Sequence, residues 1–166
     1  MRKLSTIWAP LYFVGLLLVL IPISEVTIAA WPPRIGEVAW RFSAFGMIGQ
    51  GIMTPLLGLL LMLLAALEME HLKVAKTLGV LCGFAALGFA VLLLLATLDT
   101  LQMRSAVSAE VRNAFDIATV AAFAKHAAGL LGTVLIAFAA FRGARSTREP
   151  SGQDKLVVGG RASKKG

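Results

Sequence analysis

Four long apolar segments follow one another along the chain, and short polar stretches separate them. They cover residues 7–29, 43–67, 77–98 and 117–141, and each is 22 to 25 residues long. A helix of about 20 residues crosses the hydrocarbon core of a bilayer. None of the segments alternates apolar and polar positions as a membrane β-strand does. The pattern therefore predicts four membrane-spanning helices.

Three short connections join these segments, at residues 30–42, 68–76 and 99–116. Helices joined by short connections pack as antiparallel neighbours. The expected fold is all-α: an integral membrane four-helix bundle over residues 1–141, with an up-down-up-down course. We expect the third helix to extend to about Arg104 and the fourth to begin near Ala109. The two would form a helical hairpin that protrudes beyond the outer face of the bilayer.

Prolines mark two of the segments. Pro22 lies in the first segment and Pro55 in the second. Each removes a backbone hydrogen bond, so each is expected to kink its helix. Pro32 and Pro33 follow the first segment and are expected to begin an extended loop.

The composition agrees with a membrane location. Hydrophobic residues make up 58% of the chain and charged residues 15%, against about 25% charged residues in an ordinary soluble domain. This balance excludes an ordinary cytosolic enzyme and a disordered chain. The formal net charge is +7, but residues 1–141 carry nine Lys and Arg against seven Asp and Glu. Residues 142–166 therefore supply +5 of the net charge of +7.

The positions of Lys and Arg predict the orientation in the membrane. Four spans place both termini on one side, which would carry eleven Lys and Arg against five on the other. Both termini are therefore expected in the cytoplasm, and a bacterial cytoplasmic membrane is the expected location. Trp8, Trp31 and Trp40 fall at the expected membrane interfaces, where aromatic belts lie. A cleaved signal peptide is the alternative for residues 7–29, but this segment is long enough to span and has Glu25 in the cleavage region.

Residues 142–166 form a segment rich in Gly, Ser and Arg, with seven Lys and Arg and two Asp and Glu. Such a composition predicts a disordered cytoplasmic tail. Its positive charge predicts attraction to anionic lipid at the membrane surface. Nucleic-acid binding is not expected, because neither a folded basic module nor interleaved aromatic residues accompany the charge.

Small residues recur at helical spacing in two of the segments. Gly79 and Gly83 form a GxxxG pattern in the third segment, and Ala128, Gly129 and Gly132 lie in the fourth. Small residues let helix backbones approach closely in lipid. We expect them to pack helices within the bundle, and a homodimer face is the alternative.

Polar side chains within a span are costly, so they are the first candidates for function. They are Glu25, Gln50, Thr54, Lys125 and His126. Under the predicted topology, all of them lie in the outer half of the bilayer. Glu25 and Lys125 could pair across the bundle, or Lys125 could extend to the outer interface.

His126 belongs to a small and polar face of the fourth segment. Thr119, Ala122, His126, Gly129 and Thr133 recur at intervals of three and four residues, which places them on one side of a helix. This side is expected to face the bundle. We expect a hydrogen bond from His126 to a neighbouring helix, with a proton-titrating group or a cofactor ligand as the alternatives.

No cofactor or metal is expected. A haem iron with two histidine ligands would need His71 and His126, which the predicted topology separates by roughly 20 Å or more along the membrane normal. The single cysteine, Cys82, allows neither an intrachain disulfide nor a cysteine-based zinc site. The sequence contains no HExxH, GxSxG, Walker A or GxGxxG pattern.

These patterns favour a non-enzymatic integral membrane protein, such as a structural or accessory subunit of a membrane assembly. Its expected partners are the lipid bilayer and another membrane protein or a second copy of the chain. The alternative is a small transporter or proton-linked protein that uses Glu25, Gln50, Lys125 and His126 in an outward-open polar cavity. A membrane enzyme with a lipid substrate would need a convergent site that the sequence does not reveal.

Overall fold

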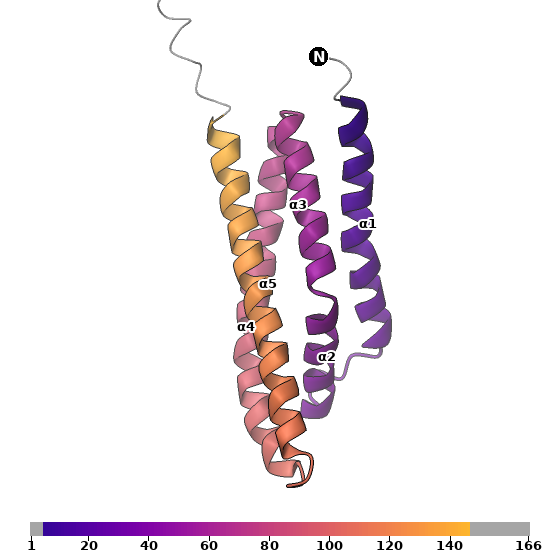
Figure 1. Ribbon diagram of the computed structural model, residues 1–166, viewed down its shortest axis with the longest axis vertical. Coiled ribbons are helices and arrows are strands. Elements are labelled where there is room, and N and C mark those ends of the chain that lie inside the picture. Colours follow the sequence, from indigo (N-terminus) through magenta and orange to yellow (C-terminus); the bar gives the residue numbers. More distant parts are fainter. Residues whose placement is uncertain (1–4, 147–166) are drawn as a thin grey trace, which may run out of the picture.

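The structure is a computed structural model that describes residues 5–146. This part of the chain is all-α, as predicted, with five helices and no strand. The helices are α1 (Ser5–Ala29), α2 (Val38–Gly51), α3 (Met53–Glu68), α4 (Leu72–Ala106) and α5 (Arg112–Ser146). Figure 1 shows that they run roughly along one long axis, with the start of α1 and the end of α5 at the same end of the molecule.

Three of these helices, α1, α4 and α5, are long and apolar enough to cross a membrane. The pair α2 and α3 passes the same test only together, and the two helices are bent by 49° at their junction. The sequence predicts one span over residues 43–67, whereas the structure divides this segment at Ile52. The number of candidate spans is therefore three, or four if the bent pair is one span.

The break between α2 and α3 has a local cause in Pro55. Proline has no N–H to donate to the carbonyl four residues earlier, and here that carbonyl belongs to Gly51, the last residue of α2. The kink predicted at Pro55 is confirmed as this bend. Pro22 lies inside α1, which continues unbroken from Ser5 to Ala29.

The two longest helices, α4 and α5, have 35 residues each. At 1.5 Å per residue, each is about 52 Å long, well beyond a hydrocarbon core of about 30 Å. They contact each other more extensively than any other pair of helices, and they form an antiparallel hairpin in Figure 1. The boundaries fall close to the predicted ones: α4 ends at Ala106 and α5 begins at Arg112. At its other end, α5 continues past the predicted limit of residue 141 to Ser146; residues 147–166 of the predicted tail lie outside the described residues.

The first helix packs chiefly against α3, at a pair of glycines. A Cβ atom added to Gly58 would lie 2.5 Å from the carbonyl oxygen of Gly15, and one added to Gly15 would lie 2.8 Å from the carbonyl oxygen of Gly58. The two backbones are therefore in contact, with no room for a side chain between them. This crossing holds α1 against α3, and the backbone of α1 does not pack on α4 or α5.

The five small residues singled out in the sequence divide into two groups. Gly79 faces α5, Gly129 faces the α2–α3 junction and Gly132 faces α3. Gly83 has open space where a Cβ would lie, and Ala128 is exposed. Contacts between the described helices thus involve three of the five residues, and the other two lie on the surface.

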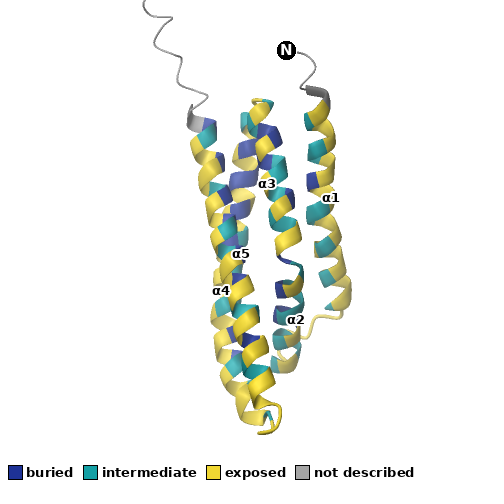
Figure 2. Ribbon diagram, in the orientation of Figure 1, coloured by how far each residue is buried: buried dark blue, intermediate teal, exposed yellow. Residues whose placement is uncertain are grey.

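The buried core lies between α3, α4 and α5, toward the end where α1 begins and α5 ends. Its buried members are Leu63, Ala66, Ala75, Leu78, Cys82, Ile136 and Ala140. Figure 2 shows buried residues on the inward sides of the helices and exposed residues over most of the outward sides. The outward residues include many large apolar side chains, so the described helices present an apolar surface.

The glycine crossing makes a prediction with a matched pair of variants. Replacing Gly58 by alanine forces a methyl group against a backbone oxygen, and we expect the free energy of unfolding to fall by about 1–3 kcal/mol. The measurement is thermal unfolding of the purified protein in detergent. The Gly88→Ala variant is the control, because a Cβ at Gly88 meets nothing within 4 Å and alanine favours the helix. Equal stability of the two variants would contradict the crossing.

Candidate functional site

The structure does not bring the five predicted polar residues into one site. His126 is fully buried, whereas the other four, Glu25, Gln50, Thr54 and Lys125, are exposed. The possible ion pair between Glu25 and Lys125 is absent from the described residues. Its absence follows from the packing, because Glu25 lies on α1 and Lys125 on α5, and these helices do not pack against each other.

His126 is a residue of α5, and its side chain lies between α2 and α4. Its Nδ1 is 2.9 Å from the carbonyl oxygen of Ala122, one turn earlier in α5. The prediction of a hydrogen bond from His126 to a neighbouring helix is therefore wrong, because the bond lies within α5 itself. The imidazole ring stacks on Phe45 of α2, with centroids 3.8 Å apart and planes inclined by 13°. The ring of Phe89 of α4 is nearly perpendicular to the imidazole, with centroids 6.1 Å apart.

The stacked position of His126 decides how α2 packs on α5. A Cβ at Gly49 would lie 2.9 Å from Cε1 of the imidazole, so only glycine lets α2 come this close. Because Nδ1 donates its proton to the carbonyl of Ala122, Nε2 is left as an acceptor. Nε2 is buried and has no hydrogen-bond partner within the described residues.

The predicted inward face of α5 agrees with the burial. Thr119, His126, Gly129 and Thr133 are all buried, and Ala122 is half-buried. The hydroxyl of Thr133 donates to the carbonyl of Gly129 at 2.9 Å. The hydroxyl oxygen of Thr119 is buried without a partner in the described structure.

An ion pair that the sequence does not reveal joins α2 to α4. Arg41 donates from Nε to Oδ2 of Asp99 at 2.9 Å and from Nη2 to Oδ1 at 2.6 Å. Arg41 also donates from Nη1 to the carbonyl of Ile35 at 2.8 Å. Asp99 is only 3% exposed, so its charge depends on this two-bond contact with the guanidinium. The pair holds the end of α2 that lies farther from the bend against α4.

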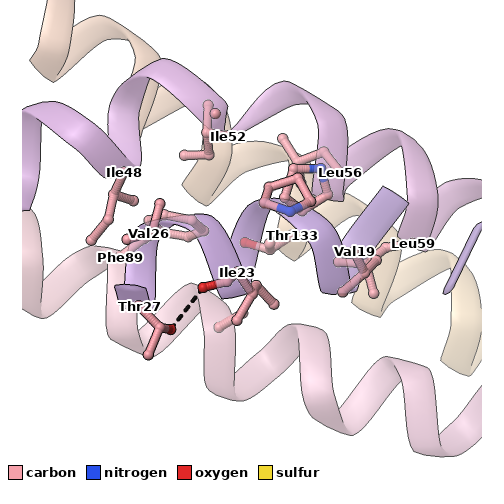
Figure 3. A pocket seen from close by; sticks show the side chains of 14 residues that line it. Val19, Ile23, Val26, Thr27, Ile48, Ile52, Leu56, Leu59, Phe89 and Thr133 are labelled. Atoms are coloured by element: carbon pink, nitrogen blue, oxygen red, sulfur yellow. Dashed lines mark hydrogen bonds between the residues drawn. The ribbon is translucent and has the colours of Figure 1, made fainter. Parts of the chain in front are cut away.

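An apolar cavity of about 270 Å³ lies beside the α2–α3 break. Figure 3 shows aliphatic side chains of α1, α2 and α3 around it, with Phe89 of α4 and Thr133 of α5. The two hydroxyl groups in its lining donate hydrogen bonds within their own helices. Thr27 donates to the carbonyl of Ile23 at 2.7 Å, and Thr133 donates to the carbonyl of Gly129. Such a cavity offers apolar contact and no free hydrogen-bonding side chain in its lining.

A second cavity, of about 310 Å³, lies between α2 and α5; we call it the α2–α5 groove. Its lining residues are Phe42, Phe45, Gly46, Gly49, Gln50, Phe115, Ala118, Thr119, Ala121, Ala122 and Lys125. Two of the predicted polar residues, Gln50 and Lys125, therefore share one site. His126 is absent from this lining, although its neighbours Phe45 and Ala122 belong to it.

Comparison with known proteins finds no relative: no protein-family model, no curated protein and no solved structure matches the chain. Within residues 5–146, no three His, Cys, Asp or Glu side chains are grouped so that they could hold a metal ion. A functional interpretation therefore has to start from the geometry of the chain itself.

The Arg41–Asp99 pair makes a stability prediction. Replacing Asp99 by asparagine leaves the guanidinium without its counter-ion, and we expect a loss of about 3 kcal/mol in the free energy of unfolding. The measurement is chemical denaturation of the protein in mixed micelles. Arg104→Gln is the control, because the Arg104–Asp116 pair has side chains that are 55% and 37% exposed, and its loss is expected to cost less than about 1 kcal/mol. Similar losses in the two variants would show that the buried pair has no special weight.

Proposed function

We propose that the chain is a non-enzymatic, multi-pass subunit of a membrane assembly. In this proposal the chain has four antiparallel spans: α1, the bent pair α2–α3, α4, and α5. The observation that carries it is the outward face in the middle of α4, where the large exposed side chains are apolar and two glycines have open space beside them.

The outward face of α4 has the features of a helix-packing surface. Gly83 and Gly88 have nothing within 4 Å of where a Cβ would lie. The exposed side chains around them are large and apolar, among them Phe84, Leu87 and Leu94. An apolar surface of this kind is covered by lipid or by protein, and small residues within it allow another helix to approach closely.

The proposed orientation rests on the charge distribution and has support from the fold. Figure 1 places the start of α1, the α3–α4 turn and the end of α5 at one end of the molecule. Lys73 and Lys76 follow that turn. We propose that this end faces the cytoplasm, in a bacterial cytoplasmic membrane, with the basic residues 142–166 near anionic lipid.

The second candidate function is a small transporter or proton-linked protein. The observation that favours it is the α2–α5 groove, where Gln50 and Lys125 share one lining. His126 lies behind this lining and Glu25 lies on α1, so only part of the predicted polar cluster would take part.

Photo-crosslinking in native membranes tests the subunit proposal. A photoreactive residue at Leu87 is expected to yield one crosslinked protein product of defined mass, because this position lies on the proposed packing face. Phe13 on α1 is the matched control, since both side chains are 63% exposed, and it is expected to react with lipid alone. Gly83→Leu, one turn from Leu87, should reduce the protein product by filling the open space.

Crosslinking to protein that is absent at both positions, or equal at both, would contradict a specific face on α4. The product is identified by mass spectrometry of the crosslinked peptide. A peptide of this chain would indicate a second copy, and a peptide of another membrane protein would indicate a distinct partner.

A further inference from the structure

The α2–α5 groove contains a lysine without a counter-ion. Lys125 forms no ion pair and no hydrogen bond within the described residues. It lies four residues from residue 129, the midpoint of α5, which corresponds to about 6 Å along the helix axis. If α5 crosses a bilayer as proposed, an ammonium group at this depth is costly unless an anion accompanies it or the side chain reaches water.

Among the described residues, no carboxylate lies in the lining of the groove. The other two polar side chains of the lining both have hydrogen-bond donors. Gln50 has an amide NH₂ and is exposed. Thr119 is 8% exposed, and its hydroxyl oxygen is buried without a partner in the described structure.

These three groups define the ligand chemistry. An ammonium group, an amide NH₂ and a hydroxyl can all donate, and an ionised carboxylate accepts through two oxygens. A single lysine matches a single negative charge, and charge-assisted hydrogen bonds are stronger than neutral ones. A buried hydroxyl with no partner costs free energy, which an acceptor in the groove would recover.

The remaining lining is aromatic or small. Phe42 and Phe115 stack with ring centroids 5.3 Å apart, and Phe45 lies further along α2. Gly46 has open space where a Cβ would lie. A volume of about 310 Å³ falls at the small end of ligand sites. The occupant that suits this lining therefore has a compact apolar body beside its charged end.

We propose that the α2–α5 groove binds a small monocarboxylate with an apolar body. Its carboxylate lies at Lys125, with Gln50 and Thr119 as further donors, and its apolar body lies against Phe42, Phe45 and Phe115. The depth of the charged end rests on the proposed membrane placement, and the site does not depend on the proposed packing face of α4.

Octanoate is the probe for this site, labelled with ¹³C at its carboxyl carbon. The full chain, with ¹⁵N-labelled lysine side chains, is placed in nanodiscs of zwitterionic lipid. Solid-state NMR is expected to detect a dipolar contact between the carboxyl carbon and a lysine Nζ. Titration of the bound carboxyl signal gives the affinity of each variant.

Lys125→Gln is expected to abolish the contact and to weaken octanoate binding about tenfold or more, the loss of one charge-assisted bond. Thr119→Val is expected to weaken binding severalfold. Lys125→Arg keeps the positive charge and should retain most of the affinity, which separates loss of the site from loss of the fold. Lys73→Gln is the matched control, an exposed lysine on α4, and should change nothing.

Two further ligands test the sign of the charge and the role of the apolar body. Octylammonium has the same chain with a positive charge and should not displace octanoate. Propionate has the carboxylate with little apolar body and should bind far more weakly. Strong propionate binding would point to a site for small anions without an apolar body, and would overturn the role assigned to Phe42, Phe45 and Phe115.

Unchanged octanoate affinity in Lys125→Gln, or equal competition by octylammonium, would overturn the proposal. This result would leave the crosslinking at Leu87 unaffected, because that residue lies on the outward face of α4. Conversely, loss of the α4 interface would leave octanoate binding in place. The two proposals therefore fail separately.

Discussion

The bend between α2 and α3 is the constraint on which the rest of the structure depends. Pro55 cannot donate a hydrogen bond to the carbonyl of Gly51, and the two helices diverge by 49° at this point. Both α2 and α3 pack on α4 and α5, but α3 also follows α1 through the Gly15–Gly58 crossing. The bend lets one apolar segment of the sequence contact α4 and α5 along its length while only its second half packs closely on α1.

Two contacts hold α2 in its position, and each uses a different kind of interaction. Arg41 and Asp99 fasten one end of α2 to α4 through a two-bond ion pair. Nearer the bend, Phe45 stacks on His126 of α5. The apolar cavity beside the break is lined mainly by aliphatic residues of α1, α2 and α3. The α2–α5 groove is lined by residues of α2 and α5 alone, and these include polar side chains. Lys125 lines the groove because α2 packs on the part of α5 that contains Lys125 and the buried His126.

Much of the fold could be predicted from the sequence, and the reasons are local. Apolar segments of spanning length predicted the helices, Pro55 predicted the kink, and the spacing of Thr119 and His126 predicted an inward face of α5. The contacts that depend on three-dimensional packing could not be predicted. Arg41 and Asp99 are far apart in the chain and meet where α2 packs on α4. The possible pairing of Glu25 with Lys125 failed for a related reason, since it requires α1 to reach α5 and the glycine crossing holds α1 on α3.

The most direct test of this account is the distance between α2 and α5 in a bilayer. Spin labels at Ser43 and Ala114, both exposed, lie beside the stacked rings of Phe42 and Phe115, and Cys82→Ala removes the native thiol. Pulsed electron paramagnetic resonance is expected to give one short, narrow distance in the native sequence and a longer or broader one in Pro55→Ala. Identical distance distributions with and without Pro55 would contradict the central role of the bend.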